Sequence, residues 1–245
     1  MSKESRKILV ATTNPGKIAE IRAMLGGQVN WLSLADVGPV AEITEDGATF
    51  AENARKKALG YAEASGLWTL ADDSGLVVDA LGGAPGVTSA RFCGEAVPAL
   101  RAEGIPSTGS GQALPSDRGR DARDTQGQDA LATGKDRTLL DHRNMAKVLD
   151  LLKAVPQDRR TARFVCRLCL ASPEKVLIET EGTLEGLITD SQIGQNGFGY
   201  DPIFLVPHLG KTVAQLSRGE KNAISHRGNA IRKLKPLLDE LLDKS

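Results

Sequence analysis

The stretch Lys7-Ile-Leu-Val-Ala-Thr-Thr-Asn-Pro-Gly-Lys17 predicts a strand that runs through a short loop into a helix. Its apolar first part is typical of a short buried strand. Asn14 suits the N-cap of the helix and Pro15 suits its first position, because proline has no N–H to lose there. The helix presents one apolar face, made by Ile18, Ile21 and Leu25. This strand-loop-helix unit indicates an α/β fold.

A second helix is predicted at residues 49–66. Thr49 and Glu52 form a capping-box pattern at its start, and Gly66 suits its end. Its apolar stripe consists of Phe50, Ala54, Ala58 and Tyr61. Residues 67–81 then predict a strand, a polar break at Asp72-Asp-Ser-Gly75 and a further apolar element.

The later part of the chain predicts a helix at 139–155 and two strands at 163–171 and 175–180, joined by a turn. The last helix contains Pro236, which removes one backbone donor and is expected to kink or restart it. Helices and strands alternate at the start and an antiparallel hairpin follows. We therefore expect an α/β fold with a mixed sheet flanked by helices.

Residues 94–136 are rich in Gly, Ser, Asp, Arg and Pro and carry few large apolar side chains. Such a segment cannot bury a core of its own, so we interpret it as a low-complexity insertion without activity. Over all 245 residues the composition is that of an ordinary globular protein. We expect one domain over residues 1–245, interrupted by this insertion.

Charge and hydropathy argue against several classes of partner. The chain has 31 basic and 31 acidic side chains, so nothing in its net charge favours nucleic acid or an anionic membrane. No signal peptide or bilayer-spanning apolar run of about 20 residues is found, and we expect a cytoplasmic protein. Cys166 and Cys169 lie in a predicted strand and point to opposite faces, so we expect buried structural cysteines rather than a metal or redox pair.

The loop Thr12-Thr-Asn-Pro-Gly-Lys17 is a candidate phosphate site. It places backbone N–H groups and the positive end of a helix dipole together, and Lys17 adds a cation. Gly16 lets an anion come close to the backbone. Taken alone, the same residues are also those of an ordinary capped helix.

Acidic residues offer a candidate cation site. Asp72 and Asp73 form a pair that can hold Mg²⁺ through oxygen, with one of the two facing a cleft. Glu42, Glu45 and Asp46 form a second acidic group in a loop that can reach the same ion. Solvated acids are the alternative for both groups.

Two later segments are suited to recognising a nucleotide. Gly197-Phe-Gly-Tyr-Asp-Pro202 combines aromatic rings, flexible glycines and an acid, which suits stacking on a flat base. Lys221-Asn-Ala-Ile-Ser-His-Arg227 places three hydrogen-bond donors near the start of the last helix. A plain turn and a capped, solvated helix are the simpler interpretations of these two segments.

Several motifs in order closely resemble the Ham1/inosine triphosphatase family. They are Ala11-Thr-Thr-Asn-Pro-Gly-Lys17, Thr49-Phe-Ala-Glu-Asn-Ala54, Ala71-Asp-Asp-Ser-Gly-Leu76, Leu81-Gly-Gly-Ala-Pro-Gly-Val87, Ser89-Ala-Arg-Phe92, Phe198-Gly-Tyr-Asp-Pro202 and Ser225-His-Arg227. The resemblance implies magnesium-dependent hydrolysis of non-canonical purine nucleoside triphosphates (ITP, dITP and XTP) to the monophosphate and pyrophosphate. It also implies an elongated central sheet in two lobes with the substrate cleft between them, and a homodimer.

The resemblance further implies roles for single residues. Asp73 would be the catalytic base and a metal ligand, and Glu45 would be the second metal carboxylate. Thr44 stands where relatives often have an acid, and Glu42, Glu45 or Asp72 could supply the missing carboxylate. The remaining residues would bind substrate. The phosphates would be held by Thr12, Thr13, Asn14, Pro15, Gly16, Lys17, Lys57 and Lys221, and the base would be surrounded by Phe198, Gly199, Tyr200 and Asp201. Ser74 would contact the substrate, and His226 or Arg227 would donate to the C6 carbonyl of the base.

The expected reaction is in-line attack of water on the α-phosphorus, with pyrophosphate as the leaving group. Two alternatives remain open from the sequence. One is a pyrophosphatase for modified pyrimidine or methylated nucleotides, as in the similar-looking Maf fold. The other is a nucleotide-binding module that does not turn its ligand over.

Overall fold

The structure is a computed structural model that describes residues 6–26, 29–95 and 134–244. Seven strands form one sheet in the order β2-β1-β3-β4-β5-β6-β7 among these residues. The strands are β1 (Lys7–Ala11), β2 (Asn30–Ser33), β3 (Trp68–Val78), β4 (Thr161–Ala171), β5 (Val176–Ile188), β6 (Phe204–Val206) and β7 (Lys211–Thr212). The α-helices are α1 (Pro15–Leu25), α2 (Phe50–Ser65), α3 (Gly134–Leu151), α4 (Arg218–Ile224) and α5 (His226–Asp243).

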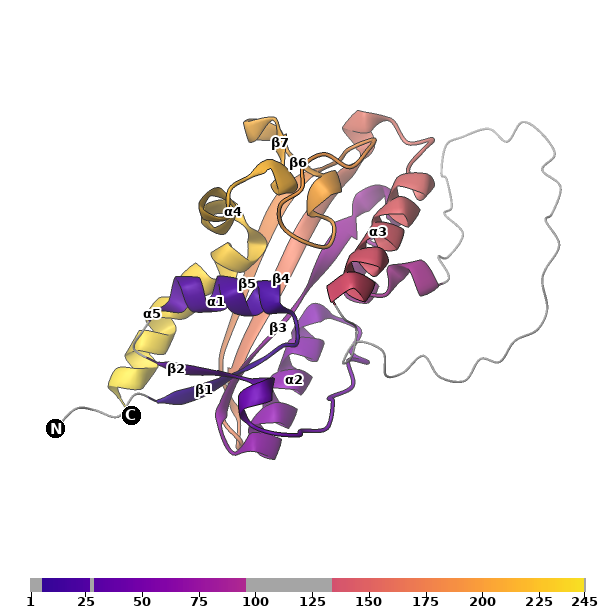
Figure 1. The fold of residues 1–245 in the computed structure, drawn as a ribbon. Coiled ribbons are helices and arrows are strands. Elements are labelled where there is room, and N and C mark those ends of the chain that lie inside the picture. The colour runs from indigo at the N-terminus through magenta and orange to yellow at the C-terminus, as the bar shows by residue number, and fades with distance from the viewer. Residues whose placement is uncertain (1–5, 27–28, 96–133, 245) are drawn as a thin grey trace, which may run out of the picture.

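The sheet is mixed, as the order of elements predicts. β1 runs parallel to both β2 and β3, whereas β3, β4 and β5 are long antiparallel neighbours. Figure 1 shows the long strands β3 to β5 forming the spine of the molecule, with α1 and α5 on the side of the N- and C-termini. The predicted α/β fold with a mixed sheet flanked by helices is therefore confirmed.

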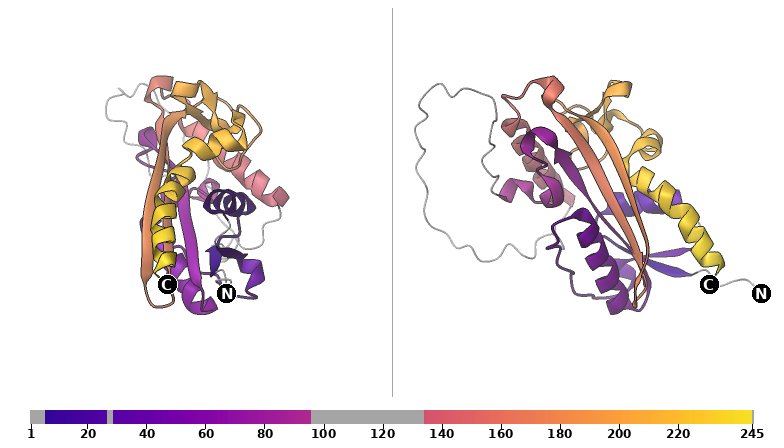
Figure 2. Two further views of the ribbon diagram at one scale, coloured as in Figure 1. Left: turned by 90° about the vertical axis from the view of Figure 1, so that its left-hand side faces the viewer. Right: turned by 180° about the vertical axis from the view of Figure 1, so that it is seen from behind.

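Helices cover the sheet unequally, and strand alternation decides which residues each helix meets. In β1, Val10 packs with α1 and α5, whereas Leu9 and Ala11 face α2. A further hydrophobic cluster joins α3 to the opposite ends of β3, β4 and β5 and to Phe204 of β6. Figure 2 shows these helices along the length of the sheet. The hydrophobic core is thus divided into clusters at the two ends of the long strands.

The predicted polar break at residues 72–75 is wrong, because β3 continues through it. Asp72 and Asp73 pair with Leu168 and Arg167 of β4, so the antiparallel neighbour holds both acids in strand geometry. Gly75 does not break the strand, and glycine is required there because space is lacking for a side chain. A Cβ there would lie 2.3 Å from the Ser89 hydroxyl, which hydrogen-bonds to the β3 backbone.

Several details differ from those expected. β5 continues to Ile188 rather than ending at residue 180, because β4 pairs with it along almost its full length. α3 starts at Gly134, so the last residues of the supposed insertion are helical, while residues 96–133 lie outside the described part of the chain. Pro236 does not restart α5. It is exposed, and water can hydrate the carbonyl whose partner it removes.

The cysteines in β4 are buried and unpaired, as the strand prediction requires. Cys166 belongs to the cluster under α1 and α5, and Cys169 to the cluster under α2. Their thiols therefore lie on opposite faces of the sheet. Within the described ranges, none of the helices is both long and apolar enough to cross a membrane.

Candidate active site

The candidate site lies where β1 ends and β3 continues. The last pair between these strands joins Ala11 to Ala71, so Asp72 and Asp73 have no β1 neighbour. α1 begins just beyond the end of β1, and its N-terminus stands over this edge. Ligands of open α/β sheets commonly bind at the carboxyl ends of parallel strands, as here. The alternation of β3 sends the two acids to opposite faces of the sheet.

Asp72 faces α1 and α5 and is buried. Its carboxylate lies 3.0 Å from the Lys17 ammonium and 3.1 Å from the Arg227 guanidinium, and it accepts a hydrogen bond from the Ser74 hydroxyl. Burial alone would raise the pKa of Asp72, but Lys17 and Arg227 hold it far below the ordinary range. Asp72 is therefore a permanent anion that fixes two of the predicted substrate-binding cations.

The contacts of Arg227 extend this pair into a buried chain of alternating charge. Arg227 lies 2.5 Å from Glu20, Glu20 lies 3.2 Å from Lys221, and Lys221 lies 2.7 Å from Asp201. The six members in order of contact are Lys17, Asp72, Arg227, Glu20, Lys221 and Asp201. Three acids thus neutralise three bases, which is the condition for holding this many charges away from water.

Asp73 faces the other way, toward α2 and the loop before it. Its Oδ2 atom is buried and has no hydrogen-bond partner. Burial raises the pKa of Asp73, with Lys57 and Lys17 opposing that rise and Glu45 adding to it. Lys57 is itself buried and lies 3.1 Å from Glu45. Burial would lower the pKa of Lys57, but Glu45 and the two aspartates raise it, so this lysine stays charged.

Asp73 and Glu45 fit the requirements of a magnesium ligand pair. Mg²⁺ prefers oxygen ligands and is usually held by one or two carboxylates, with water and substrate phosphates completing its shell. An orphaned, buried carboxylate oxygen at Asp73 beside a second carboxylate meets that description. No group of three or more potential protein ligands occurs in the described ranges. Glu42 is exposed, and Asp46 pairs with Lys56 at the surface.

The loop before α1 is tightly self-bonded. The Asn14 side chain accepts from the N–H groups of Gly16 and Lys17, and the Thr12 hydroxyl accepts from the Asn14 N–H. Thr13 and Pro15 are exposed beside it. Gly16 is expected from the sequence to let an anion approach the backbone. In the structure the Phe198 ring takes that place, since a Cβ on Gly16 would lie 2.8 Å from it.

The loop between β5 and β6 brings Phe198 against α1. The Lys221 ammonium lies 4.3 Å from the centroid of the Phe198 ring, and the Phe198 N–H donates to Asp201. Tyr200 does not offer its ring for stacking on a base. Its ring is in the hydrophobic core, and its hydroxyl donates to the Ser89 carbonyl. Of the two aromatic residues of this loop, Phe198 is therefore the one whose ring lies beside the site and could stack on a base.

His226 and Arg227 form the first turn of α5. Ser225 caps the helix, and Gly182 of β5 allows it to start directly on the sheet, since a Cβ there would lie 2.1 Å from the His226 carbonyl. The His226 ring is buried and stacks on Phe164 at 4.9 Å. Burial and the nearby cations lower the pKa of His226 well below its ordinary value, and its Nδ1 atom has no partner. The imidazole is therefore neutral, with one nitrogen free for a hydrogen bond.

The structure gathers the predicted residues from distant segments at this edge of the sheet. Lys17 contacts Asp72 and is close enough to Asp73 to lower its pKa, so the N-terminal turn and the paired acids share one location. Sequence reasoning missed Glu20, although it lies three residues after Lys17 on the same helix face. It also missed Asn53, whose hydrogen bond lowers the pKa of Asp73 and thereby opposes the effect of burial.

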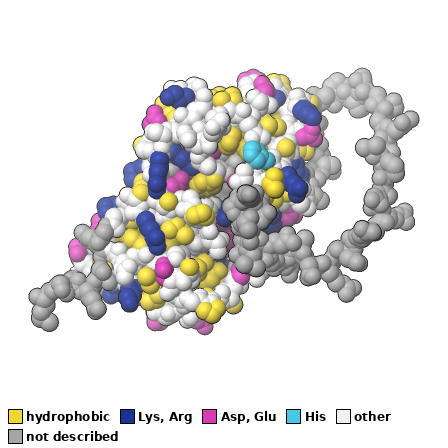
Figure 3. Space-filling model, viewed as in Figure 1, with side chains coloured by type: hydrophobic (Ala, Val, Ile, Leu, Met, Phe, Trp, Pro, Cys, Tyr) yellow, Lys and Arg dark blue, Asp and Glu magenta, His cyan; other side chains and the backbone are white. Residues whose placement is uncertain are grey.

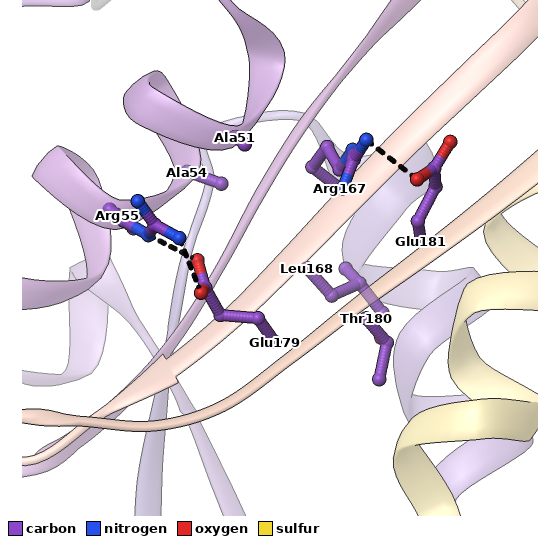
Figure 4. Close-up of a pocket in the computed structure, with 8 residues that line it drawn as sticks. All are labelled: Ala51, Ala54, Arg55, Arg167, Leu168, Glu179, Thr180 and Glu181. Carbon is purple, nitrogen blue, oxygen red and sulfur yellow. Dashed lines mark hydrogen bonds and ion pairs between the residues drawn. The ribbon is translucent and has the colours of Figure 1, made fainter.

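A separate small pocket of about 240 Å³ lies between α2 and the strands β4 and β5. Figure 4 shows Arg55 pointing to Glu179 and Arg167 pointing to Glu181 at its rim. None of the predicted site residues lines it. On the face shown in Figure 3, basic side chains are separated by acidic, apolar and neutral surface rather than joined in one patch.

The chain is similar to a group of known proteins. A model of the Ham1 family matches residues 8–106 and 130–237. A dITP/XTP pyrophosphatase of Desulforamulus reducens is 42% identical over 238 residues, covering 96% of this chain and 96% of that protein. One of Exiguobacterium sibiricum is 43% identical over 237 residues, covering 96% and 98%. The Ham1 protein structure from Coxiella burnetii has a TM-score of 0.72 at 33% identity, covering 96% of this chain and 99% of its own.

Proposed function

The chain belongs to the Ham1 family, and from this premise we propose that it hydrolyses deaminated purine nucleoside triphosphates (dITP, ITP and XTP) to the monophosphate and pyrophosphate. The observation that carries the proposal is the meeting of Lys17 with the Asp72-Asp73 pair at the end of β1. A cationic turn at a helix N-terminus and a buried carboxylate with an unused oxygen are what phosphoanhydride hydrolysis needs in one place.

The residues around Asp73 supply the chemistry. Mg²⁺ held by Asp73 and Glu45 would neutralise charge on the phosphate oxygens. Lys17 and Lys57 hold the polyphosphate, and the dipole of α1 favours its negative charge. With Oδ2, the oxygen that has no partner, on the ion, the second oxygen of the same carboxylate would orient a water toward the α-phosphorus and accept its proton. A bond forms between that water oxygen and phosphorus, while the bond to the bridging oxygen breaks and pyrophosphate leaves.

The base is recognised on the other face of β3. Phe198 offers a ring for stacking, and Lys221 and Arg227 lie 4.3 and 5.8 Å from its centroid. A C6 carbonyl, which inosine and xanthosine carry, accepts hydrogen bonds from donors in this cluster. The amino group of adenine at that position would face the same donors without a partner, and such mismatches of buried polar groups discriminate strongly.

We further propose that the protein is cytoplasmic and, from the family resemblance, that it is a homodimer. Its mass in solution, measured by light scattering after gel filtration, tests the oligomeric state. A single-chain mass of 26.0 kDa over the micromolar range would contradict the dimer.

Pyrophosphate release decides the proposed activity. The chain is assayed with dITP, ITP, XTP, GTP, ATP and dUTP, with magnesium and after chelation. We expect release from the first three with magnesium and a large loss after chelation. Preference for dUTP would instead favour a Maf-like activity, and binding without release would favour a non-catalytic module.

The variant Asp73→Asn tests the assigned base and ligand. We expect its turnover to fall at least 100-fold, since it removes both roles. Asp46→Asn is the matched control. Asp46 follows Glu45 in the chain, but it is exposed and pairs with Lys56 at the surface. Near-normal turnover of Asp73→Asn at saturating magnesium would refute the assignment.

A further inference from the structure

α3 contacts the loop between β5 and β6 through His142, which lies 3.1 Å from Gln192, and through the carboxylate of Asp141, which reaches the predicted base-binding residues. The Gly199 N–H donates to Oδ2 of Asp141 at 2.9 Å, across 58 residues of sequence. Figure 1 shows α3 beside the loop that joins β5 to β6. Asp141 is half-buried, and no sequence motif singled it out.

Two carboxylates hold successive N–H groups of this loop. Asp201 accepts from the Phe198 N–H, and Asp141 accepts from the Gly199 N–H. Gly199 has a φ of +61°, so glycine is favoured at the position where the chain turns toward α3. The peptide before Phe198 is thereby held by Asp201, and the peptide after it by Asp141. The ring of Phe198, which lies against Gly16, takes its position from these two peptides.

The same face of α3 is anchored independently of Asp141. Asn144, one turn further along, donates to the carbonyls of Ser89 and Ala90 and accepts from the Cys93 N–H. Met145 and Val148 bury the helix in the hydrophobic core. Loss of the Asp141 carboxylate therefore leaves α3 attached, and its effect should be confined to the loop.

We propose that Asp141 is a positioning residue for substrate specificity, which sets the Phe198 ring through the Gly199 N–H. This inference rests on the proposed function, in which Phe198 stacks on the purine base. Asp141 touches neither phosphates nor the proposed magnesium ligands, so its contribution is to base binding alone.

The test separates base binding from phosphate binding. For Asp141→Ala we expect the KM for ITP and the inhibition constant of IMP to rise about 5- to 10-fold, the value of one ordinary hydrogen bond. kcat should stay within about twofold, and inhibition by pyrophosphate, which has no base, should not change. Asp141→Asn should restore most of the affinity, because its amide oxygen can accept the Gly199 N–H.

Asp150→Ala is the matched control on α3, since Asp150 is exposed and pairs with Lys153 at the surface. It should leave every constant unchanged. An unchanged IMP constant in Asp141→Ala would overturn the inference. Equal weakening of IMP and pyrophosphate would also overturn it, because the defect would then be a general disturbance of the site.

Hydrogen exchange keeps this test separate from the test of the activity. The peptide covering residues 195–203 should exchange faster in Asp141→Ala than in the unchanged chain, and at the unchanged rate in Asp150→Ala. If the unchanged chain releases no pyrophosphate from any purine triphosphate, the proposed function fails. Faster exchange in Asp141→Ala together with weaker IMP binding would then still support the positioning role, and unchanged exchange would refute it.

Discussion

Replacing Glu20 by Gln should destabilise the protein more than any surface charge change of the same kind. Glu20 is 6% exposed and neutralises two buried cations, Arg227 at 2.5 Å and Lys221 at 3.2 Å. Removing one partner of a buried ionic group typically costs 3–5 kcal/mol, because the remaining charge is left unpaired. Here Arg227 keeps Asp72 and Lys221 keeps Asp201. We therefore expect the lower end, about 3 kcal/mol.

Thermal and denaturant unfolding measure this loss. For a chain of this length, about 3 kcal/mol corresponds to a Tm lowered by roughly 6–12 °C. Glu240→Gln is the matched control, since its carboxylate pairs with Lys244 on the surface of the last helix. Exposed pairs of this kind contribute about 0–1 kcal/mol. If the two variants lost the same small amount, the buried chain of alternating charges would not stabilise the fold as argued.

Three further outcomes are expected. Gly16→Ala should raise the KM for ITP several-fold with little change in kcat, because its Cβ would lie 2.8 Å from the Phe198 ring and displace it. Lys57→Gln should lower turnover at least 10-fold, whereas Lys56→Gln, whose side chain is 47% exposed, should not. Burial alone would raise the pKa of Glu20, but Arg227 and Lys221 lower it below the ordinary value of 4.5. The stability that the Glu20 carboxylate gives to the fold is therefore fully present above pH 4.5, and it is lost as the pH falls through the lowered pKa of the folded state. The Tm difference between the unchanged chain and Glu20→Gln should accordingly shrink below pH 4.5.

Local elements could be predicted where a few neighbouring residues determine them. Asn14 and Pro15 start α1, and the Thr49-Glu52 capping box starts α2, as expected. Each signal acts within one helical turn and does not depend on the rest of the fold. The candidate site could be located for a related reason, because the proposed phosphate turn follows β1 and the acids come directly after an apolar run that is itself recognisable as a strand.

Pairing between strands lay beyond this kind of inference. Asp72, Asp73 and Gly75 have low strand propensity and therefore predicted a break. In the fold, β4 provides ten consecutive partners along β3, from Thr69 to Val78, and these interactions outweigh the local preference. The result matters for the proposed function, because a continuous strand places the two acids on opposite faces, Asp72 with the cations Lys17 and Arg227 and Asp73 at the proposed metal site.

The partners of the buried cations follow from a physical requirement rather than from a motif. Lys17, Lys221 and Arg227 could each be predicted to bind substrate, but a cation enclosed by protein must be neutralised when no substrate is present. Asp72 and Glu20 provide that charge here. The requirement predicts that buried acids exist near the site, and their spacing from Lys17 on α1 could have suggested Glu20. Only the packing of α5 against α1 decides that Arg227 reaches both acids, because this contact joins residues 207 positions apart.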